Sequence, residues 1–341
     1  MRVVIADLPI FTAWIEELIA AQPVMGVQAR DERFVFAPLH QAADLRLDYD
    51  VTILPPKKYF QPAWEKLSSF TGPAEFQTQS STEPFIILGV HPYDVVAIAQ
   101  MDTIFARDKF DAHYMARRQR ATIIACDVQS VSDNVFAACM GTATTERGFD
   151  ILLTRIGERY VVDARTARGE SQLGVLAQAP AADAVSLGRR QQVWDDNRQH
   201  LCRHSLRMPP QALPELLAAS YEHPVWEEKA QRCFSCGSCN LVCPTCYCFD
   251  VQDEVDWDLR QGRRWRTWDG CLLKDFAAVA GGHNFRKSRA DRYRHRFYRK
   301  GKYVPDKIGE IACVGCGRCI TACVTKIASP VEIYNRLLEA K

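Results

Sequence analysis

The sequence predicts a mixed α/β domain over residues 1–210, followed by a largely helical, cysteine-rich domain over residues 211–341. Three observations support this division. Apolar strand-like runs alternate with amphipathic helical patterns before residue 210. All but three of the fourteen cysteines come after it. Prolines interrupt the segment between the two, LRMPPQALPELL at 206–217. A chain of 341 residues is long enough for two domains that each bury a core.

Three segments carry the α/β prediction. Residues 84–105 run from an apolar strand-like stretch through Gly89 and Pro92 into an amphipathic helix. Residues 121–128 are typical of a buried strand, and residues 150–164 of a hairpin with Gly157 and Glu158 in its turn. After residue 215 the segments between cysteines are expected to be helical or loop-like.

Composition points to an ordinary globular protein, with 47% hydrophobic and 25% charged residues. No apolar run reaches the roughly 18 residues that span a bilayer, and Asp7 comes too early for a signal peptide. We therefore expect a cytoplasmic protein with no membrane span. Because disulfides are rare in a reducing compartment, cysteine spacing is first a sign of metal ligation. Cys126, Cys139 and Cys202 are isolated and are expected to pack in the core.

The C-terminal cysteines form two copies of one run, C-x2-C-x2-C-x3-C, each of which supplies three thiolates on a tight loop. In two-cluster ferredoxins the fourth cysteine of each run binds the cluster of the other run. The sequence therefore predicts two [4Fe–4S] clusters, or about eight irons per chain. The expected ligands are Cys233, Cys236, Cys239 and Cys323 for one cluster, and Cys313, Cys316, Cys319 and Cys243 for the other.

Two other metal hypotheses remain. A pair of zinc sites is disfavoured because the cysteine motifs of structural zinc sites usually lack a third closely spaced cysteine and the three-residue spacing before the fourth. Cys246, Cys248 and Cys271 are left over once two clusters are filled, and with Asp250 or His283 they could hold a third metal centre. The alternative is that these three thiols pack beside the clusters as small hydrophobes.

Net charge is +2, yet the segment from Arg260 to Lys302 holds fourteen Lys and Arg against three Asp, a local excess of +11. The aromatic residues within this segment would suit an iron–sulfur protein that binds nucleic acid. A protein that uses its clusters only structurally is another alternative. Since cubanes with four thiolates are anionic and the rest of the chain is acidic, we favour cluster electrostatics and a docking surface. No nucleic-acid partner is expected. Lys57 and Lys58 could contact a partner or a phosphate, but a solvated pair is the favoured expectation.

Several motifs resemble one known family. They are CPTCYCFD (243–250), RTWDGC (266–271), AGGHNFR (280–286) and CVGCGRC (313–319), and, nearer the N-terminus, ILPPKKYFQPAWE (53–65), GVHPYD (89–94) and MGT (140–142). They resemble the β-subunit family of soluble NAD(P)-linked [NiFe] hydrogenases, or sulfhydrogenases, which also includes the corresponding 4Fe-4S dicluster subunit of anaerobic sulfite reductase. The family pattern at 91–94 is RPCD. His91 and Tyr93 replace its Arg and Cys, so no role of that cysteine extends to this chain.

The resemblance implies an α-helical ferredoxin-like fold for the C-terminal domain and a heteromeric complex. The chain would relay electrons between an FAD/NAD(P)-binding reductase subunit and the small and large subunits of a [NiFe] hydrogenase. The alternative catalytic partner is a siroheme sulfite reductase subunit. No G-x-G-x-x-G follows a strand, so flavin and NAD(P) are expected on a partner. We find no catalytic constellation in this chain, and assembly is the expected role of residues 1–210.

Overall fold

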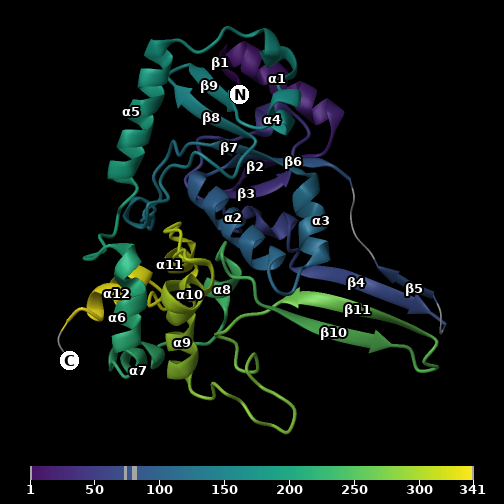
Figure 1. Cartoon of the computed structure of the whole chain (residues 1–341), viewed down its shortest axis with the longest axis vertical. Helices are drawn as coiled ribbons and strands as arrows, with labels where there is room; N and C mark the ends of the chain where they lie inside the picture. Colours follow the sequence, from purple (N-terminus) through teal and green to yellow (C-terminus); the bar gives the residue numbers. More distant parts are fainter. Residues whose placement is uncertain (1, 73–74, 79–82, 340–341) are drawn as a thin grey trace.

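The structure, a computed structural model, describes residues 2–72, 75–78 and 83–339. Its N-terminal part is built on a seven-stranded sheet in the order β1-β9-β8-β7-β6-β2-β3 (Figure 1). Parallel pairing joins β2, β6, β7 and β8 through the middle of the sheet, and antiparallel pairs form both of its edges. The strands are β1 (Arg2–Asp7), β2 (Val24–Arg30), β3 (Arg33–Pro38), β6 (Phe85–Val90), β7 (Ala121–Cys126), β8 (Ile151–Ile156) and β9 (Arg159–Ala164).

Helices cover both faces of this sheet, as its central apolar strands require. On one face α1 (Leu8–Ala21) packs Phe11 and Trp14 against the strands. On the other lie α2 (Pro92–Ala106), α3 (Ala112–Arg120) and α5 (Ala184–His200), which contributes Trp194. The expected strand–loop–helix unit, buried strand and hairpin are all confirmed as β6–α2, β7 and β8–β9. The N-terminal region is therefore α/β.

A second, four-stranded antiparallel sheet projects from the side of the molecule (Figure 1). It pairs β10 (Phe249–Val255) and β11 (Gln261–Trp268) with β4 (Trp64–Thr71) and β5 (Glu75–Thr78). The expectation of only helices and loops between the C-terminal cysteines is therefore wrong. The hairpin was missed because its charged strands have little buried surface, so their alternation carries a weak signal.

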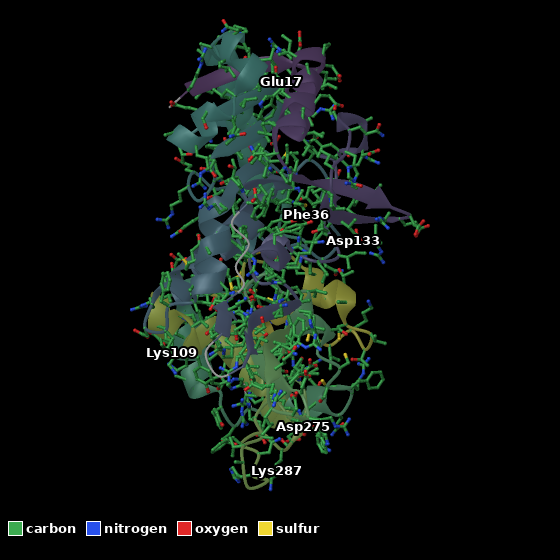
Figure 2. All side chains as sticks on the ribbon, turned by 90° about the vertical axis from the view of Figure 1, so that its right-hand side faces the viewer. Glu17, Phe36, Lys109, Asp133, Asp275 and Lys287 are labelled. Atoms are coloured by element: carbon green, nitrogen blue, oxygen red, sulfur yellow. A yellow bond between two sulfur atoms is a disulfide. The ribbon has the colours of Figure 1, made fainter. Side chains whose placement is uncertain are left out.

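The rest of the C-terminal region consists of short helices around Trp226, Phe297 and Tyr334. They are α6 (Leu213–Ala219), α7 (Val225–Ala230), α8 (Ser238–Leu241), α9 (Arg289–Tyr298), α10 (Pro305–Ile308), α11 (Arg318–Ala322) and α12 (Pro330–Arg336). Figure 2 shows an elongated molecule with Glu17 near one end and Lys287 near the other. None of the described helices is long and apolar enough to cross a bilayer.

Buried ionic contacts join the two regions. Arg318 of α11 forms a two-point ion pair with Asp94 of α2, at 2.7 and 2.6 Å, and its Nε donates to the backbone carbonyl of Thr52. Arg266 of β11 binds Glu65 of β4 at 2.6 Å. All four of these charged side chains are less than 5% exposed. The cysteine-rich region therefore depends on the N-terminal region for charge compensation as well as for strand pairing.

Candidate metal centres

The first cysteine run lines one cavity together with the last cysteine of the second run. Cys233 and Cys236 lie on the loop that leads into α8, Cys239 lies within α8, and Cys323 follows α11. The backbone between the first ligands adopts positive φ at Ser235 and Gly237, which wraps the loop around the cavity. The cavity that these cysteines line is small, with a volume of about 20 Å³. We call it cavity A.

The second run lines another cavity, cavity B, with Cys243 from the first run. Cys313, Cys316 and Cys319 lie before and within α11, and Cys243 follows α8. Its volume is about 20 Å³, the same as that of cavity A. The structure therefore groups the eight cysteines as the crossed spacing rule groups them. Within the described residues no group of three or more His, Cys, Asp or Glu is placed to hold a single metal ion.

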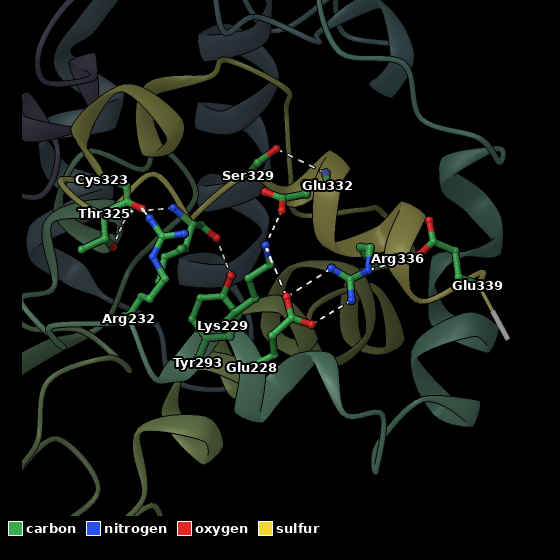
Figure 3. A network of polar contacts seen from close by, with 11 residues as sticks. Glu228, Lys229, Arg232, Tyr293, Cys323, Thr325, Ser329, Glu332, Arg336 and Glu339 are labelled. Carbon is green, nitrogen blue, oxygen red and sulfur yellow. Dashed lines mark hydrogen bonds and ion pairs between the residues drawn. The ribbon is translucent and has the colours of Figure 1, made fainter. Parts of the chain in front are cut away.

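A network of polar contacts holds the loop that carries Cys323 (Figure 3). Arg232, just after α7, donates to the carbonyl of Thr325 at 2.9 Å, and Tyr293 of α9 donates to the carbonyl of Ile327. The backbone N–H of Ile327 in turn donates to the sulfur of Cys323 at 3.4 Å. These contacts place Cys323 on the wall of cavity A, although ninety residues of chain separate it from Cys233.

Burial makes some of these thiols hard to ionise before metal binds. It raises the pKa of Cys239 and of Cys313 to about 12 each. Coordination removes the thiol protons, so cluster insertion and the final packing of the region are coupled. Buried cations offset the resulting charge. Arg296 and Lys300 line cavity B, and Lys300 Nζ donates to Thr245 Oγ1 at 2.7 Å.

Gly317, between two expected ligands, is required for close approach of another backbone. Its φ is +76°, and a Cβ there would lie 2.3 Å from the carbonyl oxygen of Asn134. Gly309 has nearly the same φ, +75°, but a Cβ there would meet nothing within 4 Å. Alanine substitutions at the two positions therefore separate the effect of backbone strain, which both share, from that of steric crowding, which only Gly317 has.

We expect Gly317→Ala to displace the 134–136 loop and to lower iron retention in cavity B. Gly309→Ala, the matched control, should cost only the roughly 1–2 kcal/mol of a left-handed alanine and leave the iron content unchanged. Iron and sulfide analysis of both purified variants, alongside their thermal unfolding, measures the difference. Equal iron content in the two variants would mean that the close approach at Gly317 does not matter for the site.

The three leftover cysteines line a third cavity, cavity C. Cys246, Cys248 and Cys271 lie on its wall, and its volume is about 10 Å³. The acidic side chain on this wall is Asp269, which the sequence did not single out. Neither Asp250 nor His283 lines the cavity; Asp250 is an exposed residue of β10, and His283 is exposed in a loop.

Two other expectations need correction. Cys139 and Cys202 are not isolated, because the structure joins them in a disulfide. Their loops are brought together by packing between residues 63 positions apart, which spacing alone cannot reveal. Lys57 is not solvated: it is 3% exposed, and its Nζ donates to the carbonyl of Cys246 at 2.6 Å and lies 4.3 Å from the ring centroid of Trp268. Cys126 is buried in the α/β core, as expected.

Comparisons with known proteins agree with this geometry. The 4Fe-4S dicluster domain family matches residues 232–327, which include all the cysteines of cavities A, B and C. Sulfhydrogenase 2 subunit beta of Pyrococcus furiosus is 30% identical over 345 residues, which cover 99% of each chain. The chain belongs to the sulfhydrogenase beta-subunit family.

This membership confirms the resemblance drawn from the sequence motifs. With the dicluster match, it makes the chain an iron–sulfur protein of the hydrogenase electron-transport class. The fold also agrees with the sequence prediction in outline: an α/β region comes first, and a 4Fe-4S dicluster domain lies toward the C-terminus. Sequence reasoning missed several residues around the cavities, namely Asn240, Thr245, Asp269 and the specific roles of Arg296 and Lys300. Their only signal was proximity in sequence to the cysteine motifs.

Proposed function

We propose that the chain relays electrons one at a time through two [4Fe–4S] clusters, between an FAD/NAD(P)-binding reductase subunit and the small and large subunits of a [NiFe] hydrogenase. Cys233, Cys236, Cys239 and Cys323 would hold the cluster of cavity A. Cys313, Cys316, Cys319 and Cys243 would hold that of cavity B. The clusters supply one-electron redox chemistry when bound, and this chain positions them and sets their surroundings.

The observation that carries the proposal is the pair of cysteine-lined cavities. Each brings together four thiols, three from one run and one from the other, which is the ligand set of a cubane in a two-cluster ferredoxin. Helices α8 and α11, which carry ligands of both runs, pack against each other. Cavities A and B are therefore neighbours, as a relay requires.

The surroundings of the cavities favour a reducible cluster. Arg296 is 2% exposed, and its Nε and Nη1 have no hydrogen-bond partner among the described residues. Because it lines cavity B, these donors are available to cluster sulfides. Buried positive charge and N–H donors stabilise the more negative, reduced form of a cluster and so raise its potential.

The test is purification of the complex from its native source, with analysis for Fe, Ni and siroheme and an assay of NAD(P)H-linked hydrogen turnover. We expect nickel to co-purify with the chain, and NAD(P)H to reduce its clusters in the intact complex. Siroheme in place of nickel would assign the chain to a sulfite reductase. Clusters that dithionite reduces but NAD(P)H does not, in an intact complex, would contradict the relay.

A further inference from the structure

Cavity C resembles the two proposed cluster sites in size and in wall chemistry. Its volume is about 10 Å³, against about 20 Å³ for each of cavities A and B. Three thiols face it, from Cys246, Cys248 and Cys271, although the last is more than twenty residues away in sequence. Packing as small hydrophobes does not by itself explain this arrangement, because the side chains that surround these thiols include cations and an amide donor as well as apolar groups.

The wall of cavity C carries positive charge and hydrogen-bond donors toward those sulfurs. Arg296, Arg299 and Lys300 all line it. Asn240, 2% exposed, directs its Nδ2 at the sulfur of Cys271, 3.5 Å away, and at that of Cys246, 3.7 Å away. The unpartnered Nε and Nη1 of Arg296 are a separate indication that an anionic group belongs here or in cavity B. These are the surroundings that an anionic cluster needs.

We infer that cavity C holds a third iron–sulfur cluster, bound by Cys246, Cys248 and Cys271, with the carboxylate of Asp269 as the fourth ligand. Asp269 is the acidic side chain on the wall, and its Oδ1 is held by the backbone N–H of Gly270 at 2.6 Å. A carboxylate is a harder ligand than a thiolate, so the iron that it binds is the most exchangeable of the four.

The position of cavity C places the third cluster beside the cluster of cavity B. Thr245, Arg296 and Lys300 line both cavities. On its other side, Cys248 directly precedes β10, and Cys271 follows β11 by three residues. The third cluster therefore lies between cavity B and the projecting four-stranded sheet. This inference does not depend on which partners the proposed relay connects.

The test is iron and acid-labile sulfide analysis of the full-length chain, reconstituted anaerobically, with EPR of the reduced protein. We expect about twelve irons per chain, four for each of three cubanes. Cys248→Ala and Cys271→Ala should each lower the iron content to about eight and leave the signals of the other two clusters in place. Cys126→Ala, at a buried cysteine of the α/β core that lines none of the three cavities, is the matched control and should retain about twelve.

Asp269 is tested in the same preparation. Asp269→Ala should lower the iron content by about one and produce the spectrum of a three-iron cluster, whereas Asp269→Cys should retain all four irons. About eight irons in the unaltered chain, or stoichiometric zinc in cavity C, would overturn the inference. So would iron content that does not change in Cys248→Ala and Cys271→Ala. About twelve irons in the chain, together with clusters that NAD(P)H fails to reduce in the intact complex, would refute the relay but leave the third cluster standing.

Discussion

Cys243→Ala should remove the EPR signal of the cluster in cavity B and leave that of cavity A comparatively intact. Cys243 belongs to the first run in sequence but lines the cavity of Cys313, Cys316 and Cys319. Without its thiolate, one iron of that cubane loses its protein ligand. We expect NAD(P)H-linked turnover of the complex to fall by roughly tenfold or more, since the relay would be interrupted at this cluster.

Cys323→Ala is the reciprocal variant. It should perturb the signal of cavity A, which Cys323 lines with the first run, and spare that of cavity B. EPR of both reduced variants, with iron analysis, distinguishes the crossed scheme from one in which each run binds its own cluster. If Cys243→Ala affected only the cluster of Cys233, Cys236 and Cys239, the crossed assignment would be wrong.

Asp94→Ala should lower the free energy of unfolding by about 3–5 kcal/mol, because it leaves the buried guanidinium of Arg318 without its counter-charge. Asp94 and Arg318 are 0% and 3% exposed and form two hydrogen bonds with each other. Arg318 lies between Cys316 and Cys319, so the loss should also reduce cluster retention in cavity B. Chemical denaturation under anaerobic conditions and iron analysis measure the two effects.

The chain offers a matched control for this prediction. Arg264 and Asp253 form the same kind of two-point ion pair, at 2.6 and 2.7 Å, but on the exposed hairpin of β10 and β11. Asp253→Ala should have no measurable effect on unfolding, since water and salt screen an exposed pair. Similar losses in the two variants would show that burial of the Asp94–Arg318 pair is not what makes it important.

The cysteine sites show how far the sequence alone could go. Three cysteines at two-residue spacing can only reach one small volume, so each run predicts a cluster site wherever the rest of the chain folds. Three residues, rather than two, separate the third cysteine of each run from the fourth, so the fourth cysteine points in another direction. This spacing predicts that Cys243 and Cys323 each bind the cluster of the other run. Strand β6, helix α2 and the β8–β9 hairpin were predictable for the same reason, since local periodicity defines them.

What the tertiary structure decided depends on contacts between distant parts of the chain. Cavity C joins Cys246 and Cys248 to Asp269 and Cys271 only because β10 and β11 pair and bring the two ends of the hairpin together. Lys57 and Asp94 lie far from the cysteines in sequence, yet they meet Cys246 and Arg318 in the interior. No local sequence pattern predicts such contacts, because they result from the packing of whole helices and strands against one another. The sequence by itself determined which cysteines could bind metal, and the fold decided what surrounds them.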